Sequence, residues 1–108
     1  MIRKYISNYI IHESAKHTNS VLCVDNGGIS ISKFDVETAF TEYVDGAIAI
    51  VPGTCVSKIE EIIRESTDLS TAIDKIIAME IESATNADKV IAQIVFPKKI
   101  VRILQYLH

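Results

Sequence analysis

The chain has 108 residues, 48% of them hydrophobic and 23% charged, with four glycines and two prolines. These values fit one globular domain over residues 1–108 and exclude a disordered or low-complexity chain. No run of about 18 uncharged apolar residues is present, and the charged N-terminus lacks the apolar core of a signal peptide, so we expect a cytoplasmic protein with no membrane contact.

The charges are unevenly spread. The formal net charge of −3 divides into +2 for residues 1–20, −8 for residues 21–85 and +3 for residues 86–108. An acidic middle between two basic ends is the most informative global feature of the sequence. Two cysteines, Cys23 and Cys55, are too few for a disulfide framework, and we expect buried, reduced thiols.

The first predicted element is an amphipathic helix over residues 2–17. Its apolar residues recur at helical spacing, at Ile2, Tyr5, Ile6, Tyr9 and Ile10. The strongest local signal follows, where two β-rich runs over residues 21–32 flank Asp-Asn-Gly-Gly. These turn residues accept positive φ, so we predict a β-hairpin there.

A continuous apolar run over residues 47–51, bounded by Gly46 and Pro52, predicts a buried strand in the same sheet. Helices are predicted over residues 36–44, after Thr54, and over residues 69–84 and 98–107. Residues 90–96 fit a strand or a buried helix, and we favour the helix. The predicted fold class is α+β, with a small sheet covered by an N-terminal helix and a helical C-terminal half.

The candidate site residues are four carboxylates in the acidic middle of the chain: Glu60, Glu61, Glu65 and Asp68. Exposed helix carboxylates usually serve solubility, but a cluster of them can also dock a basic protein and speed its association. The turn from Pro52 to Cys55 offers a second site. A strand there meets a helix N-terminus, where a thiol can become nucleophilic or an anion can bind.

Three further patterns are weak. His12 and His17 lie about 140° apart on a helix, so they do not chelate one metal ion together. Lys98, Lys99 and Arg102 form a basic cluster too small to indicate nucleic-acid binding. No cofactor motif is present. The Ile-rich surface and an exposed strand edge are also compatible with a homodimer.

We therefore predict a small non-enzymatic interaction protein, such as an inhibitor, immunity or antitoxin-like protein, that binds a basic partner through the four carboxylates. The alternative is a small oligomeric enzyme or ligand-binding subunit that uses the Pro52–Cys55 turn. Nucleic-acid binding through the C-terminal basic cluster is the third hypothesis.

Overall fold

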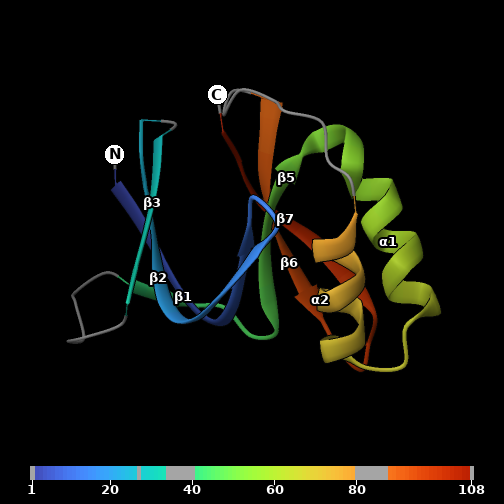
Figure 1. The fold of residues 1–108 in the computed structure, drawn as a ribbon. Helices are drawn as coiled ribbons and strands as arrows, with labels where there is room; N and C mark the ends of the chain where they lie inside the picture. The colour runs from blue at the N-terminus through green and yellow to red at the C-terminus, as the bar shows by residue number, and fades with distance from the viewer. Residues whose placement is uncertain (1, 27, 34–40, 80–87, 108) are drawn as a thin grey trace.

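A computed structural model describes residues 2–26, 28–33, 41–79 and 88–107. Within these ranges a curved mixed sheet of seven strands carries two helices on one face (Figure 1). The strands run in the order β3-β2-β1-β5-β6-β7, and β4 pairs with the first part of β1. The elements are β1 (Ile2–His12), β2 (Ala15–Asp25), β3 (Gly28–Lys33), β4 (Thr41–Tyr43), β5 (Ala47–Pro52), η1 (Gly53–Cys55), α1 (Val56–Glu65), α2 (Leu69–Ala78), β6 (Lys89–Val95) and β7 (Ile100–Leu107).

The predicted fold class is wrong, because sheet dominates and the helices are short. Residues 2–17 form β1 and the start of β2 in place of a helix, with a turn at Glu13 and Ser14, both at positive φ. Residues 90–96 and 98–107 fall in β6 and β7. Of the predicted helix over 36–44, residues 41–43 form β4, and residues 36–40 lie outside the described part.

The predicted hairpin is confirmed, with Leu22 opposite Ile31 and Asp25 opposite Gly28. The predicted strand over 47–51 is β5, and all six of its residues are buried. The helix expected after Thr54 is α1. The helix expected over 69–84 is α2, which ends at Ala78, and residues 80–84 lie outside the described part.

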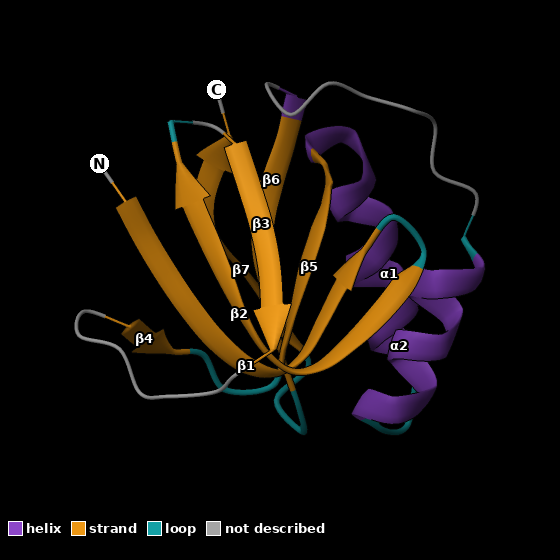
Figure 2. Ribbon diagram, turned by 60° about the vertical axis from the view of Figure 1, so that its left-hand side comes forward, coloured by secondary structure: helices purple, strands orange, loops and turns teal. Residues whose placement is uncertain are grey.

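A sharp bend divides the β1–β2 ladder. Pairing skips Asn8 and Asn19, and Asn19 has a φ of 48°. Beside this bend the directly paired Ser7 and Ser20 are both buried, and each hydroxyl donates to a backbone carbonyl. Small hydroxyl side chains can satisfy carbonyl groups that an interrupted ladder leaves open. The bend divides the sheet into two differently oriented halves (Figure 2). One half consists of β3, β2, β4 and the first part of β1, and the other consists of β5, β6 and β7.

Gly46 lies in the turn between β4 and β5, where the chain contacts both halves of the sheet. Its carbonyl accepts the Ser7 hydroxyl of β1, and the neighbouring Asp45 carbonyl accepts the Gln93 side-chain amide of β6 at 2.9 Å. Gly46 has a φ of +82°, and a Cβ built on it would lie 2.0 Å from the Ile94 carbonyl oxygen. Only glycine fits this position.

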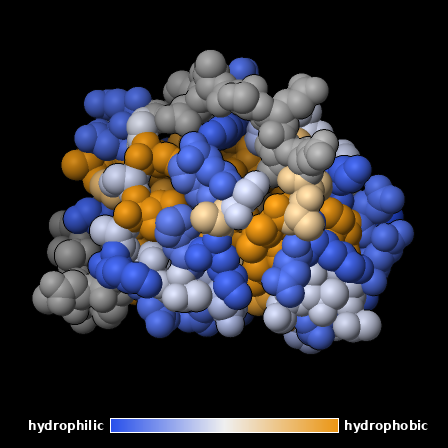
Figure 3. All heavy atoms as spheres, viewed as in Figure 1, coloured by the Kyte–Doolittle hydropathy of each residue, from blue (hydrophilic) through white to orange (hydrophobic). Residues whose placement is uncertain are grey.

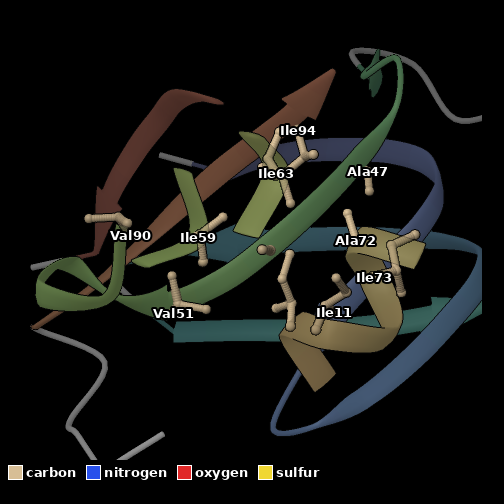
Figure 4. Packing of buried hydrophobic residues seen from close by; sticks show 11 residues of the cluster. Ile11, Ala47, Val51, Ile59, Ile63, Ala72, Ile73, Val90 and Ile94 are labelled. Carbon is tan, nitrogen blue, oxygen red and sulfur yellow. The ribbon is translucent and has the colours of Figure 1, made fainter. Parts of the chain in front are cut away.

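Two apolar clusters fill the two faces of the sheet. The outer cluster lies between the helices and β5–β6, with Ile59 and Ile63 of α1 and Ile73 of α2 pointing at the strands (Figure 4). The inner cluster fills the concave face, where Tyr5 and Leu22 from one half meet Ile48 and Ile91 from the other. The Tyr5 hydroxyl donates to the Gln105 side-chain carbonyl at 2.9 Å and joins β1 to β7 across this core.

Candidate interaction surfaces

Three of the predicted carboxylates lie on the outward side of α1. Ile59 and Ile63 are fully buried against the sheet, which fixes the helix and turns Glu60, Glu61 and Glu65 into solvent. Hydrophilic residues accordingly dominate the outer side of the molecule where α1 lies (Figure 3). None of the three carboxylates forms an ion pair with another residue in the part of the chain that the structure describes.

Asp68 has a local structural role in addition to its exposure. It is the N-cap of α2, and its Oδ1 accepts the backbone N–H of Thr71 at 2.8 Å. This hydrogen bond lowers the pKa of the Asp68 carboxyl from its ordinary value of 3.8. Asp68 is close to the α1 carboxylates in the sequence. One of its carboxylate oxygens, however, already accepts a hydrogen bond from the backbone of α2 and is less available to a partner.

Cations interrupt the acidic surface. Lys58 and Arg64 are exposed on the same helix, so the segment from 57 to 68 carries four carboxylates against two cations, a net −2. At the C-terminal end of α1, Lys99 donates its Nζ to the Arg64 carbonyl at 3.2 Å. A cation near the carbonyl end of a helix is favourable for the helix dipole. We call the exposed carboxylates Glu60, Glu61 and Glu65 the α1 acidic face.

Within the described residues, the structure places neither His12 nor His17 on the same face of the sheet as Cys55 of the Pro52–Cys55 turn. Cys55 is half-buried and packs against the outer, helix-covered cluster. His12 pairs with Ile50, whose side chain belongs to the inner cluster, so the histidine lies on the opposite face of the sheet. The other cysteine, Cys23, is also half-buried and free. In this fold the thiol of Cys55 and the imidazole of His12 are not neighbours.

The two histidines sit on a hairpin, so the helical angle predicted between them is wrong. His17 pairs with Ile10, which makes it a diagonal neighbour of His12 on one face. Burial lowers the pKa of the His12 imidazole, against the opposing effect of Glu13, whose Oε1 lies 3.8 Å from Nε2. Among the described residues no group of three or more His, Cys, Asp or Glu side chains is placed to hold a metal ion.

The C-terminal basic cluster is divided between two elements and does not form a helical stripe. Lys98 and Lys99 lie in the turn after the Phe96–Pro97 bond, and Arg102 lies in β7. The amine of Lys99 is engaged by α1. This arrangement offers less continuous positive surface than the predicted helix would.

The sequence reasoning missed β7 as an exposed apolar element. Three large hydrophobic residues of this strand are exposed: Ile100, Ile103 and Tyr106, at 43%, 36% and 59%. The helix predicted over residues 98–107 would bury Ile100, whereas the strand exposes it. An alternating pattern of exposed and buried residues could have indicated a strand, but a bulge interrupts it.

Comparison with known proteins gives no match to a family model, a curated protein or a solved structure. Within the described residues no helix is long and apolar enough to cross a membrane.

Proposed function

We propose that this chain is a small, non-catalytic cytoplasmic protein that binds a basic protein partner through the α1 acidic face. The observation that carries the proposal is that Glu60, Glu61 and Glu65 are all exposed on one firmly seated helix, with Glu61 and Glu65 one turn apart and Glu60 on the flank. Carboxylates presented on a rigid element can form charge-assisted contacts without first ordering the backbone.

The packing beneath the helix supports this role. Ile59 and Ile63 are each at most 1% exposed, and Ser66 closes the last turn by donating its hydroxyl to the Ile62 carbonyl at 2.6 Å. These contacts hold the backbone of α1 in place, so its outward side chains keep a fixed spacing. Because the cations Lys58 and Arg64 lie on the same helix as these carboxylates, a suitable partner would present acidic as well as basic side chains at matching positions.

Removing the three charges tests the proposal. The triple variant E60Q/E61Q/E65Q keeps the side-chain shape and the helix propensity. A matched variant, E13Q/D45N/D74N, removes three exposed carboxylates elsewhere and changes the net charge equally. Wild type and both variants would serve as bait in the source-cell lysate at moderate salt, and the captured partner would then be titrated by calorimetry.

We expect one stoichiometric basic partner with wild type and with the matched variant. The α1 variant should bind at least about tenfold more weakly, and its affinity should depend less on salt concentration. Equal binding by all three proteins, or capture of no partner by wild type, contradicts the proposal.

A further inference from the structure

The strand β7 forms one end of the sheet. In the described part of the chain β6 is its one strand neighbour, so the backbone groups on its other side face away from the sheet. Such a row of N–H and C=O groups is a template for another strand unless the edge is short, charged or covered. β7 has eight residues and a single charged one, Arg102.

The side chains of β7 match this open edge. Of the five large hydrophobic residues exposed in the described part, three belong to β7. A bulge between β6 and β7 pairs Ala92 with Ile103 and Ile91 with Gln105, so Leu104 is the additional residue. Ile103 and Tyr106 therefore point to the same face of the sheet, although three positions separate them. The bulge creates an apolar stripe along the helix side of this edge.

The other end of the sheet, β3, has the opposite character. It has six residues, and its exposed positions include Ser30, Ser32 and Lys33. The Lys33 amine reaches back to the Thr18 carbonyl of β2 at 3.4 Å. A short polar strand with a lysine is a usual means of preventing strand addition. The two edges are therefore not equivalent.

We propose that β7 is the contact between two copies of this chain, paired antiparallel about a twofold axis near Ile103. A twofold contact brings the same surface of both copies together, so the apolar stripe meets an equally apolar stripe. Antiparallel pairing also keeps the Lys98–Lys99 turns of the two copies at opposite ends of the strand pair. At about 3.3 Å per residue they are separated by more than a Debye length of about 8–10 Å.

The contrast between the edges also limits the assembly to a dimer. Pairing of β7 with β3 of the next copy would be head-to-tail and would continue as a filament. The polar side chains and Lys33 on β3 disfavour that contact, whereas pairing of β7 with β7 uses up both apolar edges. β7 also contacts α1, so a dimer through this edge would hold two copies of the α1 acidic face on either side of the strand pair.

The test is the molar mass of three purified full-length proteins, measured by light scattering after size exclusion and by sedimentation equilibrium. Wild type is compared with I103K/Y106K, which places two charges on the apolar stripe of β7. The matched variant S30K/S32K places the same charges on β3. We expect twice the 12.0 kDa chain mass for wild type and for S30K/S32K, and 12.0 kDa for I103K/Y106K.

A wild type that stays at 12.0 kDa up to about 1 mM overturns the proposal, because a dimer with a micromolar Kd would be formed there. A folded I103K/Y106K that remains dimeric overturns it as well. If that variant does not fold, amide exchange on wild type decides: β7 amides that point away from β6 should become protected as concentration rises. Exchange independent of concentration contradicts β7 pairing.

Discussion

The two halves of the curved sheet differ in how they are covered. The helix-backed half consists of β5, β6 and β7, and it has α1 and α2 on one face and the inner cluster on the other. The bare half consists of β3, β2, β4 and the first part of β1, and in the described residues only its inner face is packed (Figures 1 and 2). All six residues of β5 are buried, and none of β3 is.

This difference indicates where the stability of the fold resides. A strand covered on both faces removes nearly all of its side-chain surface from water, whereas a strand covered on one face removes about half. The bare half must then depend on its junction with the other half. That junction consists of the inner cluster, the Gly46 turn and the Tyr5–Gln105 hydrogen bond.

The largest effect is expected at the junction, for Gly46→Ala. The new Cβ would clash with the Ile94 carbonyl, and the φ of +82° is unfavourable for any L side chain. Backbone strain and overpacking together predict a loss of more than about 3 kcal/mol in the free energy of unfolding, measured by urea denaturation. The matched control is Gly53→Ala, where the nearest atom is 3.7 Å away; we expect a change within about 0.5 kcal/mol. Similar stability of the two variants would mean that the Gly46 turn does not constrain the halves.

The second effect compares the same substitution in the two halves. Ile63→Ala creates a cavity under α1, where the side chain is 1% exposed, and should destabilise the protein by about 2–5 kcal/mol. Ile6→Ala removes a half-buried side chain from the outer face of the bare half and should reduce stability by about 1 kcal/mol. Urea denaturation of both variants measures the difference. An Ile6→Ala loss equal to that of Ile63→Ala would show that something covers the outer face of the bare half.

The same comparison explains which elements were predictable from the sequence. The β2–β3 turn, β5 and α1 follow local rules: turn residues that accept positive φ, a bounded apolar run, and a helical stripe at Ile59 and Ile63. Each of these elements keeps a regular side-chain period. The prediction therefore succeeded where the backbone is regular.

Two of the errors, in β1 and β7, fall where a strand is irregular, whereas β6 was missed because its continuous apolar run fits a buried helix as well as a buried strand. In β1 the inner cluster receives Tyr5 and Ile10, five positions apart, because the ladder skips Asn8. In β7 it receives Leu104 and Leu107, three positions apart, because of the bulge. The three-position spacing in β7 resembles a helical period, and in β1 the interruption removes the strict alternation that would identify a strand, so a pattern search favours a helix in both. The β-branched and aromatic content of β1 is the contrary signal, and it favours a strand.

The two candidate surfaces, the α1 acidic face and the β7 edge, also differ in how well the sequence predicts them. The exposure of Glu60, Glu61 and Glu65 was predictable, because helical periodicity correctly separates the two sides of α1. The capping role of Asp68 could also be predicted, from its position before an apolar helix. The exposed apolar edge at β7 could not be predicted, because whether β7 lies at the end of the sheet depends on strand order, which no local pattern encodes.

The smallest effect concerns the hydrogen bond that joins the halves. Tyr5→Phe removes the hydroxyl that donates to Gln105 and should lower the free energy of unfolding by about 0.5–1.5 kcal/mol at pH 7. Burial raises the pKa of the Tyr5 phenol above 10.0, so the unfolded chain releases this proton at a lower pH than the folded protein does. Wild-type stability should therefore fall as the pH rises through 10, and its advantage over Tyr5→Phe should narrow.

Tyr9→Phe is the control, since the Tyr9 hydroxyl has no hydrogen-bond partner among the described residues and the loss of stability at pH 7 should be smaller. A difference between wild type and Tyr5→Phe that stays constant from neutral pH to above 10 would show that this phenol does not join the two halves.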